Sequence, residues 1–96
     1  MTRDEILNLV KGENGKLAEF KVKALYLFGS AARNEARPES DVDFLVEFDG
    51  PATFDQYIRL QAFLEDLLQR RVDLVTRKGL RKELAPAIEK DCIRAA

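Results

Sequence analysis

The sequence predicts an α/β domain in which helices flank a small mixed sheet. Three runs of strand-forming residues, 22–28, 41–48 and 71–76, alternate with segments whose apolar residues recur at helical spacing. A helix-length segment separates the second run from the third, which suits a crossover between parallel strands. A chain of 96 residues has room for one such core, so residues 1–96 are expected to form a single domain.

The first segment, residues 2–17, is predicted to be a helix. Thr2 and Glu5 form a capping-box pattern, and apolar residues follow at helical spacing. Gly12 and Gly15 weaken the second half of this pattern, because glycine is a poor helix former.

Residues 22–28 are expected to form a buried strand, because the run is short and rich in strand formers. The strand ends at Gly29 and Ser30. We expect a short helical turn over 31–33, and then a loop over 34–40, which contains a proline between charged residues.

Residues 41–48 give the clearest strand of the sequence. Alternate side chains of a strand point to opposite faces, so this run has one apolar face and one mainly acidic face. The apolar face consists of Val42, Phe44, Val46 and Phe48, and the other face of Asp41, Asp43, Leu45 and Glu47.

Thr53 is expected to cap a long helix that continues to about residue 70. A third strand follows at 71–76, and a last helix is predicted over 81–91, interrupted or restarted by Pro86. The resulting order is helix, strand, short helical turn, strand, helix, strand, helix.

Composition narrows the classes of function. Hydrophobic residues make up 46% and charged residues 34% of the chain, as in a folded soluble domain. The formal net charge of −1 lacks the basic excess of a dedicated nucleic-acid binder, so direct nucleic-acid binding is not expected. No apolar run is long enough to cross a membrane and no signal peptide is visible, so we expect a cytoplasmic protein without a membrane partner.

Histidine is absent from the chain, and Cys92 is the single cysteine. These counts exclude a serine–histidine–aspartate triad, a histidine general base and a histidine-containing zinc site within the chain. The remaining chemistry belongs to carboxylates, hydroxyls, lysines and arginines. Hard oxygen ligands favour Mg²⁺ or Mn²⁺ over zinc.

The motif that carries chemistry is Gly29-Ser30, ten intervening residues, and then Asp41 and Asp43. An Asp-x-Asp pair alone is weak evidence, because roughly a third of chains this long contain one by chance. The four fixed positions together match by chance in roughly one chain per thousand. The placement also fits, since Gly-Ser ends one strand and the aspartates open the next.

The expected geometry brings these residues together. If the first two strands are antiparallel, the end of the first lies beside the start of the second. Glycine allows a close backbone approach to a ligand, and Ser30 adds a hydroxyl donor. The parallel crossover places Asp73 beside Asp41 and Asp43, and a divalent cation would relieve the repulsion between these carboxylates.

The run GSAARNEARPESDVDFLVEF resembles the signature of the minimal nucleotidyltransferases, a branch of the polymerase-beta-like nucleotidyltransferase superfamily. The similarity covers nearly the whole chain and implies the superfamily's α/β core. It implies that Gly29, Ser30 and Arg33 bind the phosphates of a nucleotide. Asn34 departs from the glycine that is frequent in the family, but asparagine tolerates a left-handed backbone and should preserve the turn.

The same resemblance implies that Asp41, Asp43 and Asp73 form the catalytic and metal-binding set, with Asp73 polarising the acceptor hydroxyl. Each of two residues also has an interpretation without a chemical role. Asp73 could be a structural aspartate on an edge strand, and Arg33 could be a surface arginine. The implied cofactor is Mg²⁺, with Mn²⁺ as an alternative, and the implied substrate is ATP.

Minimal nucleotidyltransferases are commonly the antitoxins of HEPN-type RNase toxins, which they neutralise by transferring AMP to a tyrosine. The resemblance therefore implies AMP transfer to a hydroxyl of a partner protein. The acceptor is expected to be held by another polypeptide or by a second copy of this chain. The alternatives are a nucleotide-sensing protein that masks its partner stoichiometrically and, less favoured by the size of the chain, an antibiotic nucleotidyltransferase.

Other residues have simpler interpretations. Ser40 is expected to be a turn residue, and Arg37 and Glu35 are expected to be mainly solvated charges. Glu47 shares the acidic face but lies too far from Asp43 to bind the same ion. Leu60 and Phe63 widen the apolar stripe of the long helix; core filling is the default interpretation, and a partner surface is the alternative.

Overall fold

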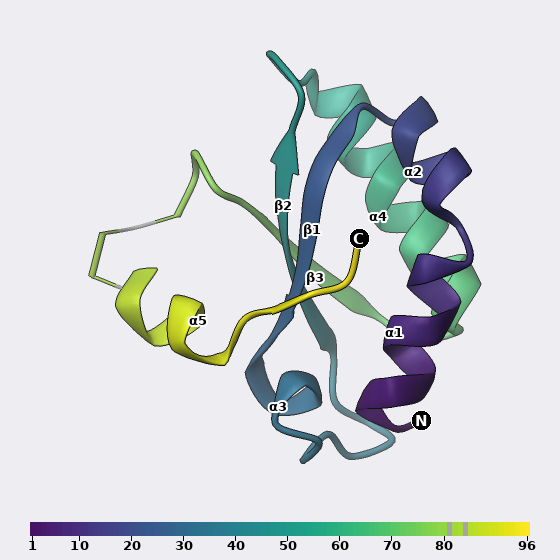
Figure 1. Ribbon diagram of the computed structural model, residues 1–96, viewed down its shortest axis with the longest axis vertical. Helices are drawn as coiled ribbons and strands as arrows, with labels where there is room; N and C mark the ends of the chain where they lie inside the picture. Colours follow the sequence, from purple (N-terminus) through teal and green to yellow (C-terminus); the bar gives the residue numbers. More distant parts are fainter. Residues whose placement is uncertain (81, 84) are drawn as a thin grey trace.

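The computed structural model describes residues 1–80, 82–83 and 85–96 and has the predicted α/β architecture (Figure 1). Helices α1, α2 and α4 cover one side of a mixed sheet, and α5 lies on the other side. The described elements, in chain order, are α1 (Arg3–Lys11), α2 (Asn14–Glu19), β1 (Val22–Phe28), α3 (Gly29–Ala32), β2 (Val42–Phe48), α4 (Phe54–Leu68), β3 (Val72–Thr76), α5 (Ala85–Asp91) and β4 (Ile93–Arg94).

The sheet has the strand order β3-β2-β1-β4. Strand β2 is antiparallel to β1, which meets the condition stated for the motif, and parallel to β3, which confirms the predicted crossover. Strand β4 was missed by the sequence interpretation. It pairs antiparallel to β1, with Ile93 opposite Leu27. Two residues are too short to produce a periodic pattern, so only the tertiary pairing identifies this strand.

The core lies between the sheet and helices α1, α2 and α4. The inward face of β2 contributes Val42, Phe44 and Val46, as the alternation predicted, and all three are fully buried. Leu60 is also fully buried, and the Phe63 ring lies 5.4 Å from that of Phe20, centroid to centroid. Both α4 residues therefore fill the core, as the default interpretation of the wide stripe expected.

Three helical segments differ from the prediction. The turn predicted over 31–33 is observed as α3 (Gly29–Ala32), two residues earlier. The segment 2–17 forms two helices, because α1 ends at Lys11 and the chain turns at Gly12, whose N–H donates to the Asn8 carbonyl oxygen at 3.1 Å. A continuous helix would have to restrict the backbone of Gly12, and glycine loses more conformational entropy in a helix than other residues do. The last helix, predicted over 81–91, is observed as α5 (Ala85–Asp91), while residues 81 and 84 of that prediction lie outside the described residues.

The predicted cap of the long helix is confirmed. Gln56 N donates to Thr53 Oγ1 at 3.1 Å, and Thr53 N donates to Gln56 Oε1 at 2.9 Å, which is a reciprocal capping box. The helix ends at Gln69, whose φ of 53° is left-handed. The chain is thereby reversed into β3, which starts beside β2.

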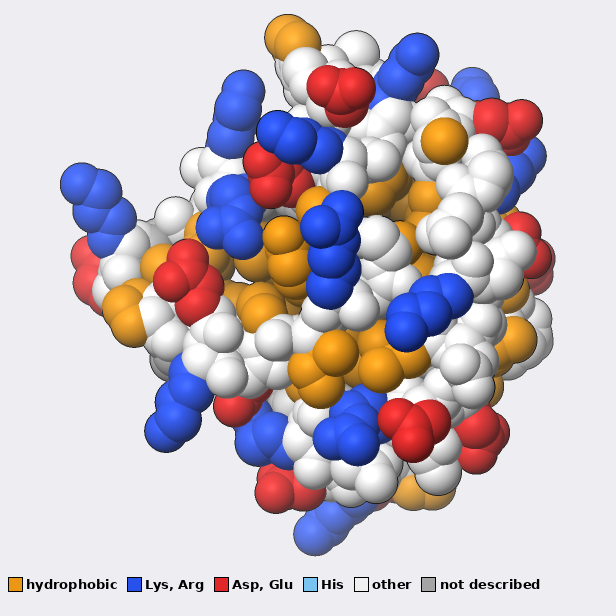
Figure 2. Space-filling view, in the orientation of Figure 1, with side chains coloured by type: hydrophobic (Ala, Val, Ile, Leu, Met, Phe, Trp, Pro, Cys, Tyr) orange, Lys and Arg blue, Asp and Glu red, His pale blue; other side chains and the backbone are white. Residues whose placement is uncertain are grey.

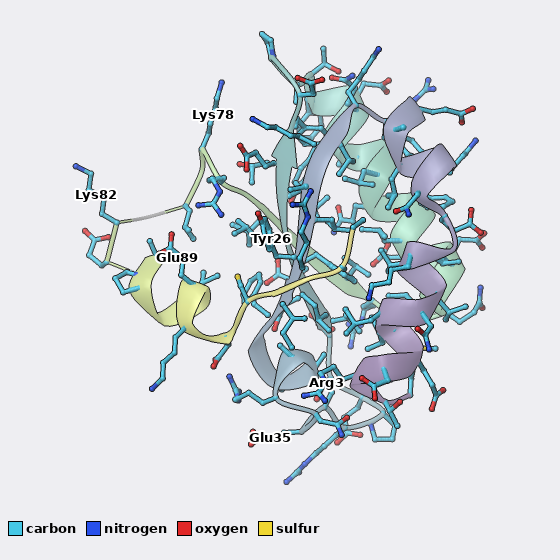
Figure 3. The ribbon with its side chains drawn as sticks, in the orientation of Figure 1. Arg3, Tyr26, Glu35, Lys78, Lys82 and Glu89 are labelled. Atoms are coloured by element: carbon cyan, nitrogen blue, oxygen red, sulfur yellow. The ribbon has the colours of Figure 1, made fainter. Side chains whose placement is uncertain are left out.

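Charged side chains surround apolar ones on the face of the molecule shown in Figure 2. On the sheet face away from the core, Arg77 lies over the Tyr26 ring at 5.7 Å and pairs with Glu47 at 3.6 Å and with Glu89 of α5 at 3.5 Å. Tyr26 and Glu89 are labelled in Figure 3. These contacts connect α5 to the strands. Among the described residues, no helix is long and apolar enough to cross a membrane.

Candidate active site

The acidic edge, which we define as Asp41, Asp43 and Asp73, lies where β2 and β3 begin. In the backbone register, Asp43 is paired with Asp73 on one side and with Phe28 on the other. Phe28 directly precedes Gly29, so the glycine turn (Gly29 and Ser30) is adjacent to the acidic edge. The structure thus brings together the residues that the motif and the strand order placed at one edge.

Gly29 is required by its backbone conformation and by its neighbour. Its φ is +73°, a left-handed value that is unfavourable for residues with a side chain. A Cβ atom at this position would collide with Oδ2 of Asp43 and would lie 3.2 Å from its Cγ. Glycine therefore allows the Asp43 carboxylate to lie directly against the turn.

The electrostatics of the acidic edge are unfavourable for a charged Asp43. Burial, followed by the nearby charges of Asp73 and Asp41, raises the pKa of Asp43 to about 6, although the positive charge of Arg33 acts in the opposite direction. A divalent cation would offset this repulsion, and carboxylate oxygens are ligands that Mg²⁺ accepts. The donor set therefore fits a hard divalent cation.

The three carboxylates do not form a preassembled set of ligands. Asp41 is exposed, and its Oδ1 lies 3.5 Å from Nε of Arg71. In the part of the chain that the structure describes, no group of three or more acidic or cysteine side chains is arranged for metal binding. A cation at this edge would therefore have to draw the carboxylates together.

Replacing Asp43 by asparagine is expected to stabilise the metal-free protein. Folding raises the pKa of Asp43 from 3.8 to about 6, so between these values the folded chain binds more protons and its stability falls as the pH rises. Above this range the charged carboxylate destabilises the fold. The loss is about 1 kcal/mol, because solvent screens part of the unfavourable interaction. Thermal unfolding of Asp43→Asn and the parent in EDTA, at about pH 4.5 and about pH 7.5, should show a smaller pH effect in the variant. Equal pH effects would contradict this account.

Arg33, which is predicted to bind phosphate, forms ion pairs with two carboxylates. Its Nη1 donates to Oδ2 of Asp91 at 2.7 Å, and its Nε donates to Oε2 of Glu35 at 3.2 Å. These hydrogen bonds raise the pKa of Arg33, Glu35 contributing most. Glu35 is exposed as expected but is also an ion-pair partner. Asp91 was missed, because it lies far away in the sequence and belongs to no local motif.

The turn after α3 has the conformation that the sequence predicted. Asn34 has a φ of 60°, which asparagine tolerates better than most residues. Its side-chain Oδ1 accepts a hydrogen bond from the backbone N–H of Arg3 at 3.1 Å. The asparagine therefore keeps the left-handed turn and also attaches it to the start of α1.

The loop before β2 is fixed by an arginine that the sequence interpretation did not identify. Nη2 of Arg70 donates to the carbonyl oxygens of Arg37 at 2.7 Å and of Ser40 at 2.8 Å. Ser40 Oγ accepts from the backbone N–H of Arg37 at 3.2 Å, as expected of a turn residue. These contacts hold the chain directly before Asp41.

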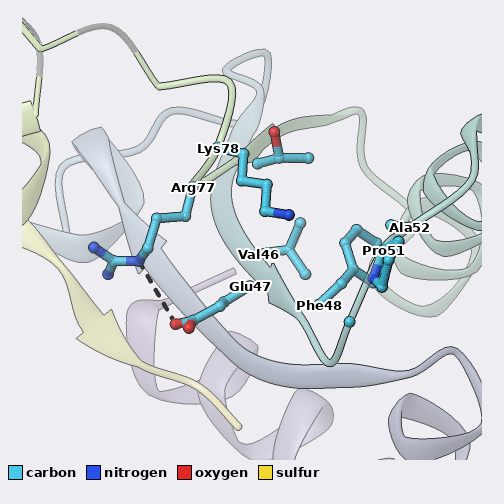
Figure 4. A pocket seen from close by; sticks show the side chains of 9 residues that line it. Val46, Glu47, Phe48, Pro51, Ala52, Arg77 and Lys78 are labelled. Carbon is cyan, nitrogen blue, oxygen red and sulfur yellow. Dashed lines mark ion pairs between the residues drawn. The ribbon is translucent and has the colours of Figure 1, made fainter.

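A separate cavity of about 510 Å³ lies at the opposite ends of β2 and β3 (Figure 4). It is lined by Val46, Glu47, Phe48, Gly50, Pro51, Ala52, Thr76, Arg77 and Lys78. Glu47 is held there by ion pairs with Lys23 at 3.7 Å and with Arg77 at 3.6 Å. Since both strands start at the acidic edge, this cavity is remote from it, and Glu47 is separate from the acidic edge as predicted.

Comparison with known proteins agrees with this geometry. Residues 7–95 match the nucleotidyltransferase domain family. The protein adenylyltransferase MntA of Thermococcus cleftensis is 35% identical over 94 residues, which are 97% of this chain and 95% of the relative. A solved structure that is provisionally described as a minimal nucleotidyltransferase has 33% identity and a TM-score of 0.85, and the match covers 97% of this chain and 95% of that chain.

A chain of the solved complex between a tri-AMPylated HEPN toxin of Shewanella oneidensis and an MNT antitoxin has the same fold. Its TM-score is 0.67 at 22% identity, and the match covers 94% of this chain and 71% of that chain. The fold, the family match and the near full-length relatives agree. The chain belongs to the nucleotidyltransferase domain family and is a minimal nucleotidyltransferase.

Proposed function

We propose that this chain transfers AMP from ATP to a hydroxyl group of a partner protein, with Mg²⁺ held by Asp41, Asp43 and Asp73. The observation that carries the proposal is the strand register, which places Asp43 between Phe28 and Asp73 and so puts the glycine turn against the acidic edge. Mn²⁺ has the same preference for oxygen ligands and is the alternative cation.

The residues would divide the reaction between them. Gly29, Ser30 and Arg33 bind the phosphates of ATP. The acceptor oxygen attacks the α-phosphorus, the bond to the β,γ-phosphates breaks, and pyrophosphate leaves with the electron pair. Asp73 accepts or steers the proton of the acceptor hydroxyl, a role typically worth about 10²–10⁴-fold in rate. A cation held by Asp41, Asp43 and Asp73 would supply stabilisation of the negative charge that develops during the transfer.

The proposed acceptor is a HEPN-type toxin, and this chain is then its antitoxin. Two comparisons support this choice: the relative named MntA is a protein adenylyltransferase, and the fold occurs in a complex of an AMPylated HEPN toxin with an MNT antitoxin. The reaction would take place in the cytoplasm, where ATP is available. Masking without transfer is the competing function, and it makes a different prediction about the mass of the toxin.

Intact-mass spectrometry tests the proposal. The chain is incubated with Mg-ATP and its cognate HEPN-type toxin, and the toxin is expected to gain the mass of one or more AMP units. Omitting the cation, or replacing ATP by AMP, should prevent the gain, because the reaction needs both the metal and the pyrophosphate leaving group. A stable complex whose toxin keeps its mass would instead indicate stoichiometric masking.

A further inference from the structure

Arg33 forms ion pairs with two carboxylates that come from different parts of the chain. Glu35 lies two residues after it, and Asp91 ends α5, 58 positions away in the sequence. A guanidinium has five N–H donors, and these two carboxylates use one at Nε and one at Nη1. Among the residues that the structure describes, three of these donors therefore remain for another acceptor.

These two ion pairs matter because an arginine side chain has many rotamers. A guanidinium that nothing restrains loses rotamer entropy when it binds a ligand. Arg33 directly follows α3, whose first residue is Gly29, so its backbone is set close to the glycine turn. Its charge also reaches the acidic edge, since it lowers the pKa of Asp43. The arginine is therefore in the region where the phosphates of a nucleotide would lie.

Asp91 is the more firmly anchored of the two partners. Its contact with Arg33 is the shorter, at 2.7 Å against 3.2 Å, and its side chain is 28% exposed, against 65% for Glu35. Two residues later, β4 begins and pairs with β1 opposite Leu27. The carboxylate of Asp91 is thus attached through the sheet to the strand that ends at the glycine turn.

We propose that Asp91 is a positioning residue, which holds the Arg33 guanidinium so that its remaining N–H groups face the phosphates of the bound nucleotide. The inference rests on the proposed function, in which Arg33 binds phosphate. Asp91 itself makes no contact with the nucleotide and acts only through Arg33. Two carboxylates bound at different nitrogen atoms keep the guanidinium in one orientation, and such preorganisation reduces the entropy lost on binding.

The chain offers a matched control on the same helix. Glu89 of α5 also pairs with an arginine, Arg77, at 3.5 Å, but this arginine lies over the ring of Tyr26 on β1. Replacing Glu89 by alanine removes a comparable tie between α5 and the sheet. It leaves Arg33 and its partners unchanged.

The test measures the dissociation constants of AMP-PNP and of adenosine, both with Mg²⁺, for the full chain and its variants. Asp91→Ala is expected to weaken AMP-PNP about tenfold, as loss of a supporting partner does at other preorganised sites, and to leave adenosine unchanged. Glu89→Ala should change neither constant. When Arg33→Ala is already present, adding Asp91→Ala should cause no further loss of AMP-PNP affinity, because the arginine through which Asp91 acts is absent.

Each alternative result identifies what fails. Unchanged or tighter AMP-PNP binding in Asp91→Ala, with weaker binding in Arg33→Ala, would overturn the positioning role alone and indicate that Asp91 competes with phosphate. Equal weakening of adenosine and AMP-PNP would show a structural effect and would also overturn it. Unchanged AMP-PNP binding in Arg33→Ala would remove the phosphate-binding role of Arg33 from the proposed function, and the inference with it.

Discussion

Replacing Asp41 and Asp43 together by alanine is expected to lower AMP transfer by at least about 10³-fold, because the charge that develops on the phosphates would lose its cation. The fold should remain intact. Asp41 is exposed and Asp43 is half-buried, and neither belongs to the apolar core. Removing like charges from one edge does not disturb packing. Intact-mass kinetics with the proposed partner toxin and thermal unfolding in EDTA measure the two effects separately.

Glu47→Ala is the matched control for this double variant. Glu47 lies on the same face of β2 as Asp43 but is held by Lys23 and Arg77 at the other end of the strand. It should keep normal transfer, because its carboxylate is too far away to share the cation. Transfer that persisted in the double variant would contradict the catalytic role of the acidic edge. A large loss of thermal stability in the metal-free double variant would contradict the account of its charges.

Gly29→Ala is expected to reduce transfer by about 10²-fold, because small displacements of a reacting geometry have effects of this size. The added Cβ would collide with the Asp43 carboxylate and force either the turn or the aspartate to move. The left-handed backbone at φ +73° adds a loss of stability of about 1–2 kcal/mol for a residue with a side chain. Transfer rates and thermal unfolding should both be measured.

Gly50→Ala separates the collision from the backbone strain. Gly50 has a similar left-handed φ of +89°, but nothing lies within 4 Å of where its Cβ would be. This variant should lose stability like Gly29→Ala and yet transfer AMP at the parent's rate. If both variants lost transfer equally, the effect would come from general destabilisation, and the close approach of Asp43 to Gly29 would have no part in it.

The strand pairing of the acidic edge could be predicted because it depends on regular geometry. Alternation placed Asp41 and Asp43 on one face, and the helix-length crossover predicted the parallel neighbour that carries Asp73. The left-handed turn at Asn34 was also predictable, since residue type limits backbone conformation. These features follow from local patterns and from simple rules of connection. The chemical roles of the residues stay predictions.

The residues that hold this geometry in place could not be predicted in the same way. Asp91 meets Arg33, and Arg70 holds the loop at Ser40, through contacts between distant parts of the chain. Strand β4 is too short for any periodicity, and the division between α1 and α2 depends on whether Gly12 is tolerated or ends the helix. Each outcome is decided by tertiary packing, which a single sequence pattern does not contain.

The parallel pairing of β2 with β3 has a consequence for how the protein matures. Asp43 and Asp73 become neighbours only after α4 has docked and the crossover has closed, which is a slower event than forming an antiparallel pair of adjacent strands. A chain emerging from the ribosome would acquire the glycine turn and Asp43 first, and would complete its acidic edge only after β3 had joined. The proposed transferase would therefore become competent late in its own folding.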